Sequence, residues 1–201
     1  DGRIVEKNSF RRSNYFEHVG NECKHVNKKV GLLDMSAFAK CIVKGPGAES
    51  WLESLFANKI PKNIGRINLV HMLSLNGGVR AEFTVYKTAP QTYYLVSAGA
   101  FESHDHDYLF KLRPKDGSVD VQRVTTQTGV LVLAGPKSRD VLQKLTDTNL
   151  SNDNFKWLTG KKINVGYATA DALRVNFVGE LGWELHHPIE MQNYIFDQVM
   201  K

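Results

Sequence analysis

The sequence predicts an α+β protein built from two similar units, each with helices packed on a largely antiparallel sheet. The main observation is an internal repeat. An apolar run, a Gly-Pro pair and a helical pattern occur at Gly45-Pro46 and again at Gly135-Pro136. In addition, alternating apolar and polar runs follow each of these helices, as expected of strands. The composition agrees, because 42% of the 201 residues are hydrophobic and 23% are charged, which is typical of a globular protein.

The first unit is expected to open with a strand at residues 41–44. A helix should follow from Pro46, because proline is favoured at the first position of a helix. Two alternating runs then meet at Asn76-Gly77-Gly78, and Asn-Gly between such runs is a strong hairpin signal. A third strand, a helix over about 102–112 and a closing strand in VDVQRVTT complete the unit.

The second unit repeats this order. It has a strand at 130–133, a helix after Pro136, the runs KKINVGYATA, ALRVNFVG and GWELHH, and a helix over about 188–200. No closing strand follows, because the sequence stops at Lys201, so we expect the natural chain to continue. Each unit therefore has the order strand, helix, strands, helix, strand, which is close to a split βαβ unit.

The composition also argues against several functions. With 26 Lys and Arg against 21 Asp and Glu, the net charge is +5, and the basic residues are scattered, so nucleic-acid binding has little support. No apolar run approaches the roughly 18 residues of a membrane helix, and the N-terminus lacks the apolar core of a secretory signal. Cys23 and Cys41 fit no disulfide framework or metal spacing. They indicate reduced thiols, as in the mitochondrial matrix or the bacterial cytoplasm.

Glu82 is the first candidate for chemistry. It follows the predicted hairpin in the run NGGVRAEFTV. On a strand, Arg80, Glu82 and Thr84 share one face, whereas the apolar residues between them share the other. Glu82 therefore lies opposite an apolar face, where it either lines a polar cavity or simply faces water.

Glu184 is the second candidate, in the run FVGELGWEL. A carboxylate on an apolar strand is costly unless it is paired. An ionised carboxylate can accept two parallel N–H donors, such as those on the edge of an aminopyrimidine ring. A salt bridge to an Arg or Lys accounts for this residue equally well.

The histidines do not predict a metal site. His104 and His106 are two positions apart on a predicted helix, so their side chains point in different directions. His186 and His187 alternate faces on a predicted strand. Neither glycine-rich stretch matches a phosphate loop or a dinucleotide fingerprint. We therefore expect no bound metal and no nucleotide cofactor in this part of the protein.

Several segments together resemble the folate-binding part of dimethylglycine dehydrogenases, which belongs to the glycine-cleavage T-protein (aminomethyltransferase) superfamily. They cover nearly the whole chain from Ser9: SFRRSNYFEHVGNE, GLLDMSAFAK, LFANKIPK, NGGVRAEFTV, VLVLAGPKSRDVLQKLT and FVGELGWELHHP. The resemblance implies a fold of duplicated ferredoxin-like units. It also implies a ligand, tetrahydrofolate, held near the centre of the domain.

The resemblance also implies roles for individual residues. Glu82 occupies the position of the family's acidic residue near the reactive folate nitrogens, which makes it the expected catalytic group. Glu184 corresponds to the family's pterin-binding glutamate, and Phe177 stands where the family usually has Tyr. The other expected cofactor-binding residues are Tyr94, Val96, Leu69, Leu185 and His186.

The same resemblance divides the chain into three parts. Residues 1–33 are expected to form an arm from a preceding domain, 34–127 the first unit, and 128–201 the second unit, truncated before its last strand and before a C-terminal barrel. FAD is expected only on the preceding flavin domain, which would be the partner that supplies an iminium intermediate.

The implied function is capture of that one-carbon unit as 5,10-methylenetetrahydrofolate, in an enzyme similar to dimethylglycine or sarcosine dehydrogenase. This piece alone is expected to be inactive. One alternative is an aminomethyltransferase of the glycine cleavage system, and another is a non-catalytic regulatory relative with the same fold.

Overall fold

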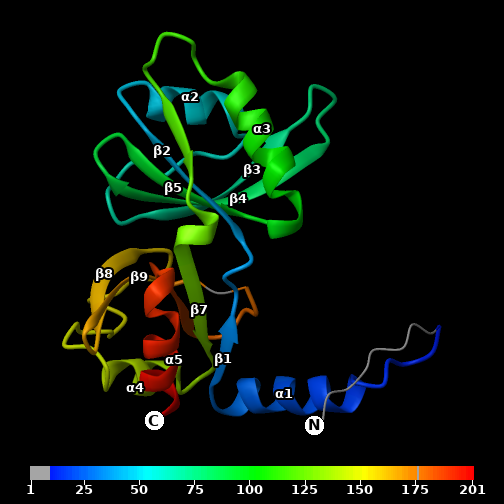
Figure 1. Cartoon of the computed structure of the whole chain (residues 1–201), viewed down its shortest axis with the longest axis vertical. Helices are drawn as coiled ribbons and strands as arrows, with labels where there is room; N and C mark the ends of the chain where they lie inside the picture. The colour runs from blue at the N-terminus through cyan, green and yellow to red at the C-terminus, as the bar shows by residue number, and fades with distance from the viewer. Residues whose placement is uncertain (1–9, 176) are drawn as a thin grey trace.

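The computed structural model describes residues 10–175 and 177–201, which form two α+β units stacked along the long axis of the molecule (Figure 1). The first nine residues of the expected N-terminal arm lie outside the described ranges. One sheet has the strand order β3-β4-β5-β2-β6 and the other β1-β7-β10-β9-β8. All neighbouring strands in both sheets are antiparallel. The predicted α+β class is therefore confirmed.

The first unit follows the predicted order, with one strand more than a β-α-β-β-α-β unit. The two strands before β5 meet at the predicted hairpin, where Gly77 has a φ of +80°. The elements are β2 (Ala39–Lys44), α2 (Ala48–Leu55), β3 (Ile67–Leu73), β4 (Val79–Ala89), β5 (Thr92–Ser97), η1 (Gly99–Phe101), α3 (Glu102–Leu112), β6 (Asp120–Arg123) and η2 (Thr125–Gln127).

The second unit has the same order of elements around its own Gly-Pro turn. They are β7 (Thr128–Ala134), α4 (Ser138–Gln143), β8 (Gly160–Val165), β9 (Ala168–Leu173), β10 (Gly182–Pro188), η3 (Ile189–Met191) and α5 (Gln192–Met200). Before the first unit come α1 (Phe16–Lys28) and β1 (Gly31–Asp34). Within residues 10–175 and 177–201, no helix is long and apolar enough to cross a membrane.

The fifth strand of the second sheet comes from the N-terminal side of the chain, which the sequence analysis did not anticipate. β1 pairs with β7 at the same place where β6 pairs with β2. The connections match as well: the Gly47 N–H donates to the Ser118 carbonyl at 3.0 Å, and the Lys137 N–H donates to the Lys29 carbonyl at 3.0 Å. β1 therefore takes the place of the closing strand that we expected the second unit to lack. The expected boundary between the N-terminal arm (1–33) and the first unit (34–127) falls inside β1.

The two repeated glycines show why the Gly-Pro turn is needed in both units. Gly45 has a φ of +127° and Gly135 a φ of +126°, a region that other residues rarely adopt. A Cβ at Gly45 would lie 2.3 Å from the Ser118 carbonyl oxygen, and one at Gly135 would lie 2.4 Å from that of Lys29. Each glycine thus lets the chain pass directly against the segment that leads into the closing strand.

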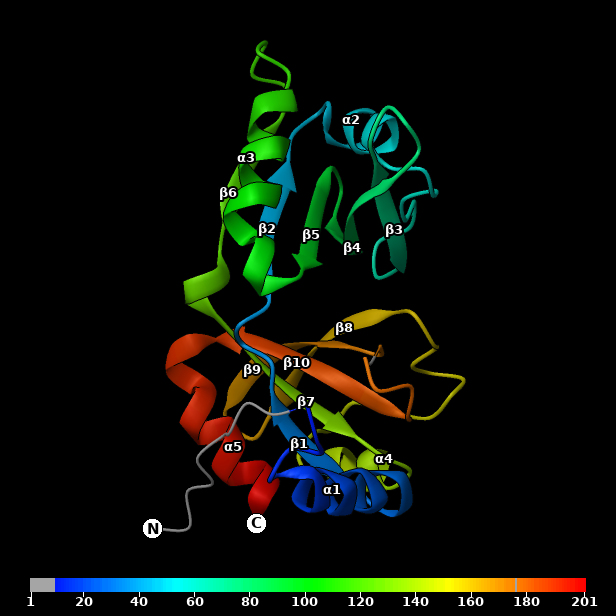
Figure 2. The same ribbon diagram turned by 90° about the vertical axis from the view of Figure 1, so that its right-hand side faces the viewer.

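The layers run helices, sheet, sheet, helices (Figure 2). Alternation along the strands produces this order: Phe83 and Val85 of β4 pack on the helix side, whereas Glu82 and Thr84 face the other sheet. A separate apolar cluster joins the sheets to each other, formed by Ile67, Tyr86, Tyr94, Val96, Val124 and Leu173. Polar side chains from both units therefore meet in the space between the sheets.

Candidate functional site

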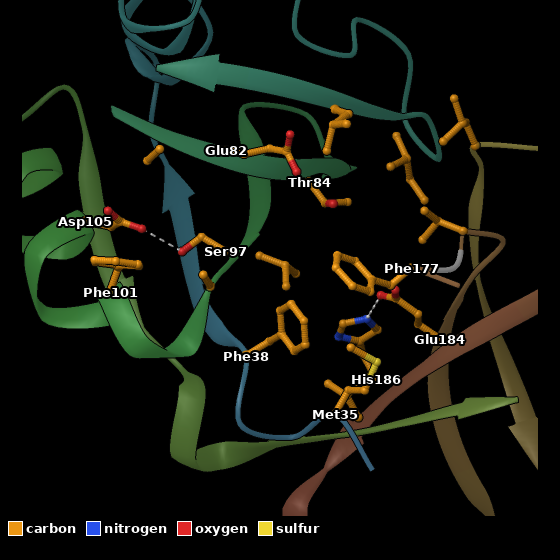
Figure 3. A pocket seen from close by; sticks show the side chains of 18 of the residues that line it. Met35, Phe38, Glu82, Thr84, Ser97, Phe101, Asp105, Phe177, Glu184 and His186 are labelled. Carbon is orange, nitrogen blue, oxygen red and sulfur yellow. Dashed lines mark hydrogen bonds and ion pairs between the residues drawn. The ribbon is translucent and has the colours of Figure 1, made fainter. Parts of the chain in front are cut away.

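A cavity of about 710 Å³ lies between the two sheets (Figure 3). Both units contribute to it, and its walls are mainly apolar with a few polar groups, as in most small-molecule sites. The lining residues are Met35, Phe38, Ile67, Leu69, Arg80, Ala81, Glu82, Thr84, Val96, Ser97, Ala98, Phe101, Asp105, Val130, Trp157, Leu158, Val175, Phe177, Glu184 and His186.

Glu184 lies on the wall that the second unit contributes. Because β10 alternates, Glu184 and His186 face the cavity while Trp183 and Leu185 pack against the helices behind the sheet. The Glu184 side chain is 14% exposed, and its Oε2 lies 3.1 Å from Nε2 of His186. In Figure 3 the carboxylate and the imidazole form one polar group beside the Phe177 ring.

A chain of hydrogen bonds supports Glu184 from behind the cavity wall. His186 is buried, and its Nδ1 lies 2.9 Å from the Tyr94 hydroxyl. Burial raises the pKa of Tyr94 well above its usual value, so the phenol keeps its proton and can donate it to Nδ1. Nε2–H of His186 then donates to Glu184. Tyr94, His186 and Glu184 thus form a chain from the first unit to the cavity that holds the carboxylate in place.

Glu82 lies on the opposite wall, on β4. Its side chain is 52% exposed, and its Oε2 lies 2.8 Å from Nε2 of His71 on the neighbouring strand β3. Thr84 shares this face, as the alternation predicted. The cavity therefore has one carboxylate in a shielded wall, Glu184, and one in a more open wall, Glu82.

A third polar group lies at the end of the cavity formed by the first turn of α3. Asp105 is buried there, and its Oδ2 accepts a hydrogen bond from the Ser97 hydroxyl at 3.1 Å. The Nδ1 of His104 lies 3.0 Å from the other carboxylate oxygen. Neither Ser97 nor Asp105 was among the predicted site residues.

The structure brings most of the predicted folate-binding residues together. Leu69, Val96, Phe177 and His186 line the cavity along with both glutamates. Phe177 is largely exposed at its mouth, and its ring meets that of Phe38 edge to face at 6.3 Å.

Two predicted residues do not line the cavity. Tyr94 is buried one layer behind the wall, and its hydroxyl is linked to the site through His186. Leu185 is fully buried in the core on the far side of β10, because odd-numbered residues of that strand face the helices. Leu185 is therefore misplaced as a contact residue, and the strand alternation used for Glu82 would have excluded it.

Other lining residues come from loops and turns that carry no sequence signal of their own. Met35 and Phe38 belong to the connection between β1 and β2, and Trp157 to the loop before β8. Periodicity places a residue on a face only inside a regular element, so these contributions could not be predicted.

The fold and the cavity between its sheets define a class of protein. The chain superposes on the glycine cleavage system aminomethyltransferase T from Bartonella henselae with a TM-score of 0.77, over 90% of this chain and 48% of that one, at 21% identity. This likeness establishes a T-protein-type fold. The chain belongs to the family described as the GCVT N-terminal domain, whose model matches residues 1–201.

Curated relatives of this chain are longer proteins. Mouse mitochondrial dimethylglycine dehydrogenase is 42% identical over 193 residues, which cover 96% of this chain and 22% of that protein. The mouse mitochondrial pyruvate dehydrogenase phosphatase regulatory subunit is 29% identical over 200 residues, covering 98% of this chain and 23% of that protein. The chain thus spans about a fifth of the length of these relatives. The similarity to dimethylglycine dehydrogenase confirms the resemblance found in the sequence.

Proposed function

We propose that the cavity binds tetrahydrofolate, with the pterin ring at Glu184 and the reactive nitrogens near Glu82, and that the domain captures a one-carbon unit as 5,10-methylenetetrahydrofolate. The observation that carries this proposal is the pair of carboxylates on opposite walls of one apolar cavity. The 42% identity to mouse dimethylglycine dehydrogenase supports the oxidation of an N-methylated glycine as the source of that unit.

The shielded wall suits a pterin. Its aminopyrimidine edge presents parallel N–H donors, and an ionised carboxylate has about four lone-pair sites, of which His186 uses one. The apolar side chains of Val96, Leu69 and Phe177 offer surfaces for the flat ring. Because Tyr94 and His186 fix the carboxylate before any ligand arrives, binding costs less conformational entropy.

The open wall suits proton transfer. Bound tetrahydrofolate supplies the two nitrogens that take up the one-carbon unit. Glu82 is placed to accept a proton from one of these nitrogens as a general base, and its exposure gives an incoming iminium access to the same place. The apolar walls exclude water around the bound ring, which limits the release of formaldehyde.

A flavin domain in the same polypeptide is the proposed source of the iminium, with FAD bound there. The mitochondrial matrix or the bacterial cytoplasm is the proposed location. Dimethylglycine dehydrogenases of mouse, human and rat are described as mitochondrial, which supports the first of these.

Calorimetric titration with tetrahydrofolate tests the binding site. Glu184→Gln should weaken binding by roughly 1.5–3 kcal/mol. The amide is neutral and has one oxygen that accepts and one NH2 group that only donates, so it cannot accept both N–H donors of the pterin edge. Glu190→Gln, the same change at an exposed position on η3, should leave the affinity unchanged. Equal affinities for wild type and both variants would refute the assignment of the pterin to Glu184.

A second candidate function is regulatory, favoured by the 29% identity to the phosphatase regulatory subunit. An aminomethyltransferase is a third reading, favoured by the fold. An assay of the full-length protein separates them, in which an N-methylated glycine is oxidised and the methylenetetrahydrofolate formed is measured. If Glu82 is the base, Glu82→Gln should spare folate binding and lower the yield of methylenetetrahydrofolate by about 100-fold. Tetrahydrofolate binding without any capture in the wild type would favour the regulatory role.

A further inference from the structure

The end of the cavity beside α3 carries two opposite charges. Arg80 of β4 and Asp105 of α3 both line the cavity there. His104 lies between them, with its Nε2 3.4 Å from Nη2 of Arg80 and its Nδ1 3.0 Å from Oδ1 of Asp105. A guanidinium and a carboxylate are thus separated by one imidazole ring, at a place to which the proposed function assigns no role.

Arg80 has no carboxylate partner among the described residues. None of the ion pairs in residues 10–175 and 177–201 includes it. Its guanidinium stacks instead on the Tyr108 ring, with Cζ 3.9 Å from the ring centroid, and this contact orients the planar group. Because a guanidinium has five N–H donors, two of them can hold a carboxylate side by side. Arg80 therefore offers a place for a ligand carboxylate.

Asp105 offers the complementary charge. Its side chain is only 6% exposed, and a buried carboxylate is costly unless it is paired. The Ser97 hydroxyl donates to Oδ2 at 3.1 Å, but no Lys or Arg in the described part of the chain forms an ion pair with this carboxylate. A carboxylate has about four lone-pair sites, so Asp105 can still accept a positive group from the cavity.

The capture step handles molecules with this same pair of charges. Oxidation of an N-methylated glycine gives an iminium whose positive nitrogen is one CH2 group away from a carboxylate. The other CH2 group, the one-carbon unit, breaks both of its bonds to that nitrogen and bonds to the two folate nitrogens. The two hydrogens of the folate nitrogens go to the departing amine, so the exchange is redox-neutral. The iminium and the amine are both zwitterions, and one subsite can therefore hold either.

We propose that Arg80 and Asp105 form a subsite for the glycine part of the iminium and of the departing amine, with the carboxylate at Arg80 and the positive nitrogen at Asp105. This inference rests on the proposed function and gives the source of the one-carbon unit its own place in the cavity. Glu82 lies two residues from Arg80 on the same strand face, so the subsite adjoins the candidate base. An iminium held there is oriented toward the folate nitrogens, which favours capture over hydrolysis.

The cavity has the order of groups that this reaction needs. In Figure 3, Glu82 lies between Asp105 at one end of the cavity and Glu184 at the other. With the pterin at Glu184 and its reactive nitrogens near Glu82, the amine occupies the remaining end. The glutamate part of tetrahydrofolate also has carboxylates that fit Arg80. Asp105 disfavours that occupant, because like charges repel, and favours a zwitterion.

The first experiment measures binding without tetrahydrofolate. The probe is trimethylglycine, which has a permanently positive nitrogen one CH2 group from a carboxylate. In the full-length protein labelled with ¹⁵N at histidine, the ring signals of His104 are identified by their loss in His104→Gln. We expect trimethylglycine to shift these signals in the wild type and not in Arg80→Gln. Tetramethylammonium, which lacks the carboxylate, should not shift them at the same concentration. Unmoved His104 signals in the wild type would overturn the inference.

The second experiment measures capture in the full-length protein, with tetrahydrofolate and an N-methylated glycine as substrates. The readout is the ratio of methylenetetrahydrofolate to free formaldehyde, because both products come from the same oxidation. Arg80→Gln should lower this ratio about tenfold, since a charge-assisted bond to the carboxylate is lost. The oxidation rate and the tetrahydrofolate affinity should change less than about twofold. Arg80→Lys keeps the positive charge without the fork of donors, so its ratio should be intermediate.

The matched control is Arg113→Gln. Arg113 also stacks on an aromatic ring of α3, with Cζ 4.5 Å from the Phe110 centroid, but it lies outside the cavity lining. Its substitution should leave the ratio, the oxidation rate and the affinity unchanged. Asp105→Asn removes the negative charge of the subsite and should lower the ratio by a factor similar to that of Arg80→Gln. Because Arg80 is exposed, its variants test the inference even if Asp105→Asn does not fold.

Two results would assign Arg80 differently. Tetrahydropteroate lacks the glutamate of tetrahydrofolate, so a loss of affinity in Arg80→Gln for tetrahydrofolate alone would place the glutamate at Arg80 and overturn the inference. A wild-type capture ratio in Arg80→Gln would overturn it as well. If the wild type binds no tetrahydrofolate, the proposed function fails, and the response of His104 to trimethylglycine still decides whether the subsite exists.

Discussion

Tyr94→Phe isolates the hydrogen bond that links the two units at the candidate pterin site. The change removes one oxygen and keeps the ring, which packs edge to face against His186 at 5.3 Å. Tyr94 is 8% exposed and His186 4% exposed, so water cannot easily replace the lost donor. Leaving a buried acceptor unsatisfied costs about 1–3 kcal/mol, which is the expected loss in the free energy of unfolding.

The effect on the ligand should be much smaller. His186 still donates to Glu184 from its other nitrogen, so we expect tetrahydrofolate affinity to fall less than about fivefold, or about 1 kcal/mol. Urea unfolding should show a lower midpoint with an unchanged slope. The control is Tyr167→Phe, the same change at a fully exposed ring, which should stay within about 0.5 kcal/mol of wild type. A Tyr94→Phe protein as stable as this control would refute the hydrogen-bond chain.

Three further outcomes are expected. Gly135→Ala should lower the free energy of unfolding by at least about 2 kcal/mol, because a Cβ there would clash with the Lys29 carbonyl and because φ at this position is +126°. The control is Gly20→Ala on α1, where the space around the new Cβ is open, and it should cause no such loss. Burial lowers the pKa of Lys40 to about 8, so this side chain loses its proton at a lower pH in the folded state than in the unfolded state. The free energy of unfolding should therefore rise by about 1.4 kcal/mol per pH unit between pH 8 and 10. Denaturation curves of Lys40→Met should lack this rise. Leu69→Ala should weaken tetrahydrofolate binding by about 1 kcal/mol in calorimetry, because it removes apolar surface from the cavity wall.

The repeat made most of the fold predictable from sequence. The Gly-Pro turns placed β2 and β7 with their helices, and the Asn-Gly signal placed the hairpin between β3 and β4. These features are local, because a turn or a helix start depends on residues close together in the chain. Both units also have the same order of elements, so each supported the prediction of the other.

β1 could not be predicted in the same way. It has only four residues, Gly31–Asp34, and half-buried side chains that show no clear alternation. Its partner β7 lies far along the sequence, so the pairing depends on tertiary packing rather than on local pattern. The sequence therefore suggested an unfinished second sheet where the structure has a complete one.

Candidate site residues could be placed from the sequence where a strand carries them. Alternation along β4 and β10 sets Glu82 and Glu184 on the faces that meet in the cavity. Their hydrogen-bond partners were harder to find: His71, beside Glu82, comes from a neighbouring strand, and Tyr94, which supports Glu184 through His186, comes from the other unit. Register across a sheet and contact between sheets are not visible in a single sequence.

The repeat also relates residues of the two sheets that occupy equivalent positions. Ile42 and Val132 occupy equivalent positions, three residues before the repeated glycines, and they pair with Tyr94 and Glu184. Tyr94 and Glu184 are therefore counterparts on β5 and β10, and the same register makes Val96 the counterpart of His186. At these equivalent positions the second unit has a carboxylate and an imidazole, whereas the first unit has an aromatic and an apolar side chain. Since the hydroxyl of Tyr94 reaches His186, the two equivalent positions belong to one hydrogen-bond chain, which begins at Tyr94 on β5 and ends at Glu184 on β10.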